Sequence, residues 1–127
     1  MILFFDRNVG TSLPQALRSL NLPAQVEWHQ QHFPQDAPDD QWLPVVGTWG
    51  WTVIGYDQRF HRNEAERNAL KQYGVGCFYL WGGDKSGWER MRFFLNVFEK
   101  IQRADTVTAR PFLFKIEGTG QVRRIAL

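Results

Sequence analysis

Short uninterrupted apolar runs alternate along the chain with segments in which apolar residues return every three or four positions. The first run, at residues 2–5, ends at Asp6, as expected for a strand that is covered on both faces and leads into a polar loop. Later runs rich in β-branched or aromatic residues have the same character. Together these runs predict strands at residues 2–5, 24–29, 51–55, 76–80, 112–116 and 121–125.

The segments between the runs carry a helical period, which is clear where Leu13, Leu17 and Leu20 recur at i, i+4 and i+7. Helices are predicted at 12–20, from 39 or 40 to the glycines at 47 and 50, at 64–73 and at 88–102. The longest one carries an apolar face made of Met91, Phe94, Leu95, Phe98 and Ile101. Residues 30–38 are polar, contain two prolines and show no period, so a loop is predicted there.

Strands that alternate with helices favour a parallel sheet with helices on both faces. We therefore predict an α/β fold, a three-layer α/β/α sandwich whose central sheet is mostly parallel. A chain of 127 residues has the usual size of one domain, so residues 1–127 are expected to form a single domain with its core at about 1–102. Residues 111–127 predict a C-terminal strand pair that extends or covers a sheet edge.

Composition narrows the class of protein. A hydrophobic content of 43% excludes a disordered chain, because such chains bury too little apolar surface to offset their entropy. The start of the chain lacks the features of a signal peptide and no apolar run is long enough to span a bilayer, so we expect a cytoplasmic protein with no membrane partner. The single cysteine, Cys77, lies in an apolar run and is expected to be a buried thiol. The net charge of +2 does not indicate a nucleic-acid binder by itself, although most of the basic residues are Arg, whose planar fork suits phosphate.

Acidic side chains stand where two of the predicted strands end. Asp6 follows the first strand, and Asp57 follows the strand at 51–55. Ligands of open α/β sheets bind outside the carboxyl ends of the strands, so both acids are expected at the binding edge. A single Asp after a strand is also a common loop or capping residue. The repetition of the arrangement favours the functional interpretation.

Two further pairs of acids open predicted helices, Asp39 or Asp40 and Glu64 or Glu66. One member of each pair could simply cap the helix or favour its first turn, so the choice within each pair stays open. Clustered carboxylates raise one another's pKa unless a cation lies among them. Oxygen ligands suit Mg²⁺ or Mn²⁺, which can activate water for phosphodiester hydrolysis. The predicted metal ligands are Asp6, Asp39, Asp40, Asp57 and Glu64.

Other side chains at the same edge could contact a phosphate backbone, with solvated loop charges as the alternative. The predicted substrate contacts are Arg7, Asn8, Arg59 and Arg62, and Lys85 lies in another loop of this edge. Tryptophans could stack on nucleobases, but most of those at positions 42, 49, 51, 81 and 88 are expected in the core. The three histidines lack zinc-ligand spacing and are expected in loops or at the surface.

Three short stretches carry a family resemblance: FFDRNVG at residues 4–10, PDDQW at 38–42 and VIGYDQRF at 53–60. Over about residues 1–102 the chain resembles a PIN-like domain of the small bacterial kind. In that family an acid ends the first strand, another lies near the start of a following helix and a third follows a strand in a Thr-x-Asp-type motif, together holding Mg²⁺ or Mn²⁺ for RNA cleavage. Asp6, Asp39 or Asp40, and Asp57 match these places, and the resemblance implies that the catalytic residues are Asp6, Asp57 and one acid of that pair, taken here as Asp39. The chain departs from the family pattern at Gly55, where Thr is common, and at Arg7, which adds a cation beside the first acid.

The leading hypothesis is therefore a metal-dependent endoribonuclease of the PIN-like type, similar to the toxin of a type II toxin–antitoxin pair. Its expected partners are an RNA substrate and a protein antitoxin, and a homodimer is left open. The alternative is a catalytically inactive PIN-like module that binds RNA or a protein, and Mg²⁺ affinity distinguishes the two. A phosphoacceptor or phosphatase-like protein, in which Asp6 or Asp57 would be the nucleophile, ranks last.

Overall fold

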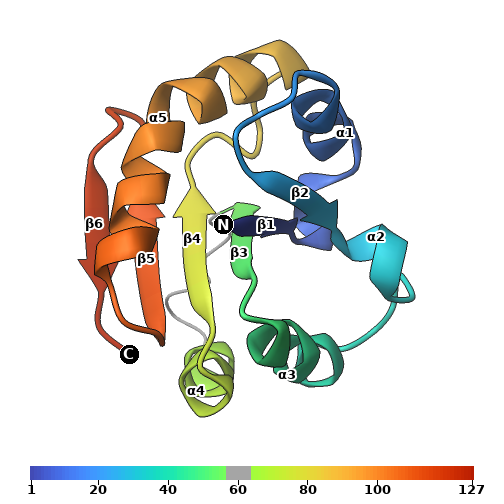
Figure 1. Cartoon of the computed structure of the whole chain (residues 1–127), viewed down its shortest axis with the longest axis vertical. Helices are drawn as coiled ribbons and strands as arrows, with labels where there is room; N and C mark the ends of the chain where they lie inside the picture. The colour runs from blue at the N-terminus through green and yellow to red at the C-terminus, as the bar shows by residue number, and fades with distance from the viewer. Residues whose placement is uncertain (57–63) are drawn as a thin grey trace.

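The computed structural model describes residues 1–56 and 64–127, which form one six-stranded sheet with helices around it (Figure 1). The strands are β1 (Ile2–Phe5), β2 (Gln25–Trp28), β3 (Thr52–Tyr56), β4 (Gly76–Leu80), β5 (Phe112–Ile116) and β6 (Val122–Ile125). Their order across the sheet is β2-β1-β3-β4-β5-β6, and all neighbours pair in parallel except β5 and β6, which are antiparallel. The predicted mostly parallel sheet and C-terminal strand pair are confirmed.

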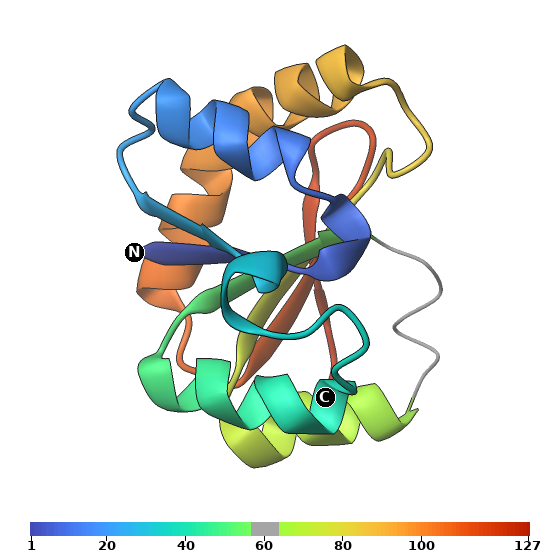
Figure 2. The ribbon, with the colours of Figure 1, turned by 90° about the vertical axis from the view of Figure 1, so that its right-hand side faces the viewer.

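The helices form the two outer layers. They are α1 (Ser12–Ser19), α2 (His29–His32), α3 (Asp39–Trp49), α4 (Glu64–Tyr73) and α5 (Gly87–Val107), with a 3-10 turn η1 (Arg7–Val9) after β1. Helices α1 and α5 cover one face of the sheet, and α3 and α4 cover the other (Figure 2). This arrangement confirms the predicted three-layer α/β/α sandwich.

The structure corrects some of the predicted helix bounds. Helix α2 forms where the sequence predicts a loop, and the side chain of Gln31 in this helix accepts a hydrogen bond of 3.0 Å from the backbone N–H of Trp28. Helix α3 passes through Gly47, where any Cβ would overlap the carbonyl oxygen of Tyr73 in α4. It ends at Gly50, whose φ of 72° is the left-handed conformation that favours glycine as a C-cap.

Two apolar cores lie on the two faces of the sheet, and β1 contributes to both. Phe4 packs against Trp42 of α3 with ring centroids 5.5 Å apart, whereas Phe5 packs against Phe94 of α5 at 5.6 Å. Neither phenylalanine is exposed to solvent. Because successive side chains of a strand point to opposite faces, a strand covered on both faces reads as a continuous apolar run.

Helix α5 begins after Ser86, whose hydroxyl accepts a hydrogen bond of 3.2 Å from the N–H of Glu89, a typical N-terminal cap. It continues to Val107, beyond the predicted end at residue 102. Phe94 is buried as predicted, but Leu95 of the predicted apolar face is 44% exposed. In the ranges that the structure describes, no helix combines the length and the apolar character needed to cross a membrane.

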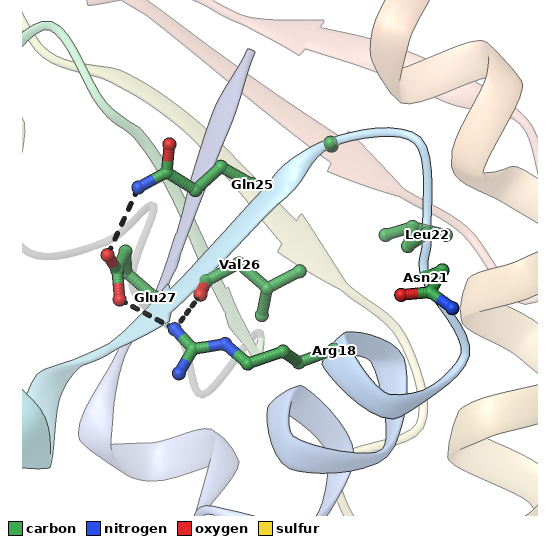
Figure 3. Close-up of a pocket in the computed structure, with 7 residues that line it drawn as sticks. Arg18, Asn21, Leu22, Gln25, Val26 and Glu27 are labelled. Atoms are coloured by element: carbon green, nitrogen blue, oxygen red, sulfur yellow. Dashed lines mark hydrogen bonds and ion pairs between the residues drawn. The ribbon is translucent and has the colours of Figure 1, made fainter.

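Strand β2 forms one edge of the sheet, and Arg18 of α1 covers part of that edge (Figure 3). The guanidinium donates to the carbonyl oxygen of Val26 and pairs with Glu27 at 2.7 Å. The same guanidinium lies 4.4 Å from the ring centroid of Trp28. The first of these contacts occupies a backbone acceptor of an edge strand that could otherwise pair with another chain.

Candidate functional site

Strands β1 and β3 are neighbours in the sheet, but the helices that follow them lie on opposite faces. Helix α1 connects β1 to β2 over one face, and α4 follows β3 over the other (Figure 1). Such a switch point leaves a crevice outside the carboxyl ends of the two strands. In Figure 2, η1 and the first turns of α3 and α4 all lie at this edge, on the side of the molecule opposite the N-terminus.

Asp6 is the first residue after β1, and both its backbone N–H and its carboxylate are hydrogen-bonded. Its N–H donates to the carbonyl oxygen of Ile54 in β3 at 2.8 Å, and its Oδ1 accepts from the N–H of Arg7 at 2.6 Å. The pKa of Asp6 is raised to about 6, and burial is the largest cause. The hydrogen bond from the N–H of Arg7 opposes the rise, the charge of Asp39 adds to it, and the charge of Arg7 opposes it. The carboxyl of Asp6 therefore loses its proton near pH 6 and is mostly ionised at pH 7.

Asp39 opens α3 and faces a cation of the same chain. Its Oδ1 lies 3.1 Å from Nη2 of Arg7 and accepts a hydrogen bond of 3.1 Å from the indole N–H of Trp42. The other Nη of Arg7 donates to the carbonyl oxygens of Gln35, at 3.0 Å, and Ala37. Arg7, predicted to contact substrate, is thus bonded to the segment that leads into α3. The neighbouring acid of the predicted pair, residue 40, is exposed on the same turn.

Glu66, in the first turn of α4, interacts with both Asp39 and Asp6. Its side chain shares a hydrogen bond with that of Asp39, and the charges of Asp39 and Asp6 act on it. Burial is the largest cause of a rise in the pKa of Glu66 to about 8, and those two carboxylates add to it. Glu64, the other member of this pair, is exposed. The structure therefore brings together Asp6, Asp39 and Glu66.

Buried side chains form the floor beneath the acids. Burial raises the pKa values of Cys77 and Tyr79, and the charges of Asp6 and Glu66 raise them further. Cys77 is completely buried, as predicted. At Gly55, where Thr is common in the family, an added Cβ would lie 3.0 Å from Cε1 of Tyr79. The tyrosine ring fills the space of the missing side chain.

Asn8, a predicted substrate contact, lies in η1 and is exposed. Its Nδ2 donates to the carbonyl oxygen of Tyr56 at 3.3 Å, so this side chain ties η1 to the end of β3. The remaining predicted site residues, Asp57, Arg59 and Arg62, lie outside the described residues, as does the histidine at position 61. Asp57 comes directly after the last residue of β3 in the sequence.

His29 is a feature of this edge that the sequence interpretation missed, because histidines were expected in loops or at the surface. Its side chain is completely buried between the rings of Phe4 and Trp42. In the part of the chain that the structure describes, neither ring nitrogen has a hydrogen-bond partner. Burial and the charge of Arg7 lower the pKa of His29, so the ring is neutral at pH 7. The available sequence signal was its place at the carboxyl end of the strand predicted at 24–29; in the structure β2 ends at Trp28 and His29 follows it directly.

The donor chemistry of the site fits a hard divalent cation. Burial and neighbouring carboxylates raise the pKa values of Asp6 and Glu66 although Arg7 opposes the rise, so a further cation would be favourable there. Oxygen is the preferred ligand of Mg²⁺ and Mn²⁺. Over residues 1–56 and 64–127, however, no group of three or more His, Cys, Asp or Glu side chains is arranged to hold a metal ion. The described acids thus supply the chemistry of a metal site without a complete set of converging ligands.

Comparison with known proteins gives one match. The family model described as "PIN like domain" matches residues 1–82. This range includes β1 to β4 and the three acids Asp6, Asp39 and Glu66. No curated protein and no solved structure matches the chain. The matched residues make up more than half of the chain, and their strand order places the acids at the switch point of the sheet. The chain belongs to the family of PIN-like domains.

Proposed function

We propose that this protein is a metal-dependent endoribonuclease that hydrolyses phosphodiester bonds with Mg²⁺ or Mn²⁺. Membership of the PIN-like family in general suggests a nuclease-type function. The observation that carries the proposal is the electrostatic linkage of Asp6, Asp39 and Glu66 at the carboxyl ends of the parallel strands.

Among the described residues no three acids are arranged to hold a metal ion, so in this proposal Asp57, from the segment after β3, would complete a ligand set with Asp6, Asp39 and Glu66. When bound, Mg²⁺ or Mn²⁺ supplies Lewis acidity toward the phosphate and a water of lowered pKa. Glu66, whose pKa is about 8, would have to be ionised to serve as a ligand of the cation. Asp6, with a pKa of about 6, is ionised at neutral pH and can accept a hydrogen bond from the attacking water.

A second function is supported by the ion pair between Arg7 and Asp39. The guanidinium already supplies positive charge to one predicted ligand, at 3.1 Å. If this pair persists at all Mg²⁺ concentrations, the chain is a catalytically inactive PIN-like module that binds RNA or a protein. The two functions differ in whether a divalent cation can displace Arg7 from Asp39.

The biological setting that we propose is the toxin side of a type II toxin–antitoxin pair in the cytoplasm. In this proposal RNA is the substrate and a protein antitoxin covers the acidic edge. A co-expressed antitoxin would be detected as a protein that abolishes cleavage while leaving the fold of this chain intact.

The test combines cleavage with metal binding. Purified protein is incubated with mixed RNA and Mn²⁺ or Mg²⁺, with and without EDTA, and Mn²⁺ binding is measured separately by titration calorimetry. Asp6→Asn and Glu66→Gln should each reduce cleavage by more than about 10²-fold and weaken Mn²⁺ binding, because each removes a charged ligand. Glu99→Gln, at an exposed position of α5, is the matched control and should change neither.

Cleavage that survives both EDTA and Asp6→Asn would exclude the metal-dependent mechanism. An absence of Mn²⁺ binding in the wild-type protein at pH 8.5, where the carboxyls of Asp6 and Glu66 are ionised, would favour the inactive module instead.

A further inference from the structure

Tryptophans are exposed beside the acidic edge, in the segment 81–88, which leads from β4 into the first turn of α5. Trp81 is 42% exposed and Trp88, in the first turn of α5, is 72% exposed, the highest value among the tryptophans. The prediction that most tryptophans lie in the core is wrong here, because of the five positions considered only Trp42 is buried. Large exposed aromatic side chains commonly mark a binding surface.

This segment is attached to the residues around the acids. Gly83 lies so close to Tyr56, the last residue of β3, that an added Cβ would be 3.0 Å from the tyrosine Cβ. Arg90 of α5 donates to the carbonyl oxygen of Val9 in η1 at 3.1 Å, and its guanidinium lies 5.5 Å from the ring centroid of Tyr56. Because β4 is parallel to β3, the segment also leaves the sheet at the same edge as Asp6.

The ring of Trp81 is held by its neighbours and makes a cation–π contact with Lys85. Its ring packs edge to face with Phe93 at a centroid distance of 5.4 Å, and an added Cβ at Gly118 would lie 3.1 Å from its Cε2. Nζ of Lys85 lies 5.3 Å from the centroid of the same ring, and the N–H of Lys85 donates to the carbonyl oxygen of Gly82 at 2.9 Å. The ammonium of Lys85 is therefore held in a defined place on the loop.

We propose that the segment 81–88 binds single-stranded RNA beside the cleavage site, with Trp88 stacking on an unpaired nucleobase and Lys85 contacting a phosphate. The proposal deepens the function proposed above and rests on it for the position of the scissile bond. An exposed indole offers a face to any base, and a nearby cation suits the backbone that follows it. Double-stranded RNA keeps its bases paired and offers no such stacking partner.

The charges of the segment indicate that stacking contributes more than phosphate attraction. Asp84 of the segment and Glu89, which follows it in α5, are exposed acids, and they balance the charges of Lys85 and Arg90. A surface without excess positive charge binds nucleic acid with a shallow dependence on salt. We therefore expect RNA affinity that falls only modestly between low and physiological ionic strength.

The test measures binding of a fluorescein-labelled single-stranded oligoribonucleotide by anisotropy in EDTA, so that cleavage does not interfere. Trp88→Ala should weaken binding about tenfold, the usual loss of one base-stacking contact, and Trp88→Phe should recover part of it. Trp49→Ala is the matched control and should bind like wild type. Trp49 is 46% exposed but lies at the C-terminal end of α3, whereas the acidic edge is at the start of this helix. Lys85→Gln should lower the salt slope by about one phosphate contact.

Unchanged affinity of Trp88→Ala, equal losses in Trp88→Ala and Trp49→Ala, or no RNA binding by the wild type would each overturn the inference. A change in molecular mass of Trp88→Ala by light scattering, with RNA affinity intact, would instead assign this surface to contact between two copies of the chain. Cleavage is assayed separately. A wild-type protein that binds RNA through Trp88 but does not cleave it would remove the proposed nuclease function and leave the RNA-binding inference standing.

Discussion

Nη2 of Arg7 lies 3.1 Å from Oδ1 of Asp39, so two adjacent residues, Asp6 and Arg7, bring opposite charges to one site. Arg7 partly neutralises Asp39, while Asp6 and Glu66 keep pKa values raised to about 6 and about 8. The site therefore holds an internal cation and two acids whose pKa values stay raised, chiefly by burial, despite that cation. This combination makes its stability and its affinity for a divalent cation depend on pH and on Arg7.

We expect Arg7→Ala to destabilise the protein by about 1–3 kcal/mol, because it leaves the buried carbonyl oxygen of Ala37 without its donor. Arg7→Lys should recover only part of the lost stability. A lysine ammonium cannot bond Asp39 and the two carbonyl oxygens at the same time, as the planar guanidinium does. Urea unfolding followed by circular dichroism measures both changes. In the folded variant, Mn²⁺ should bind more tightly, because the competing cation is gone.

Arg18→Ala is the control for this prediction. Arg18 also bonds a backbone carbonyl, that of Val26, and an acid, Glu27, but in the edge strand β2. Its removal should reduce stability without changing the affinity for Mn²⁺. Equal changes in Mn²⁺ affinity for the two variants would show that Arg7 does not compete with the cation.

The metal-free protein should lose stability as pH rises from about 4 to about 8. Glu66 and Asp6 have higher pKa values in the folded protein than in the unfolded chain, so their contribution is fully present below the unfolded pKa values. It declines as pH rises and is lost once the folded pKa values are passed. Thermal unfolding at a series of pH values, compared between wild type and Glu66→Gln, measures this decline. The variant should be less sensitive to pH between 6 and 8, because the amide does not ionise.

Mg²⁺ should counteract the same loss. Because the cation binds ionised carboxylates, the rise in melting temperature on adding Mg²⁺ should be larger at pH 8 than at pH 6. A rise that is independent of pH, or one that is retained in Glu66→Gln, would argue against a role of Glu66 in holding the cation.

Gly55→Thr should destabilise the protein by about 1–3 kcal/mol, although Thr is common at this place in the family. An added Cβ would lie 3.0 Å from Cε1 of the buried Tyr79, and the further atoms of Thr would need more space. In the Tyr79→Leu background the same substitution should be tolerated better by about 1 kcal/mol, and a double-mutant cycle from urea unfolding gives this coupling. Gly87→Thr is the control, because an added Cβ there meets nothing within 4 Å.

Asp105→Ala should destabilise the fold by about 3 kcal/mol and leave RNA cleavage unchanged in the folded protein. Asp105 accepts from the buried hydroxyl of Thr52 at 2.7 Å and from Arg110 at 3.0 Å, so its removal leaves both donors with fewer partners. Thr52 begins β3, at the end of the strand away from the acids. A loss of cleavage that is larger than the loss of folded protein would mean that this network also positions the site.

The local pattern of the sequence determined most of the architecture. The continuous apolar runs of β1 and β4 indicate strands that are covered on both faces, and the breaks at residues 10, 74 and 81–87 indicate turns. A layered parallel sheet therefore follows from interactions between residues that are close in the sequence. The same reasoning placed Asp6 at the carboxyl end of β1, because strand ends are set locally.

The tertiary structure decided which side chains meet. Glu64 and Glu66 are equivalent in sequence, but only the direction of α4 against α3 turns Glu66 toward Asp39 and leaves Glu64 in solvent. In the same way, no local pattern indicates that Arg7 pairs with a residue 32 positions away. Such pairings depend on how distant elements pack, and the burial that raises the pKa values of Asp6 and Glu66 exists only in the folded chain.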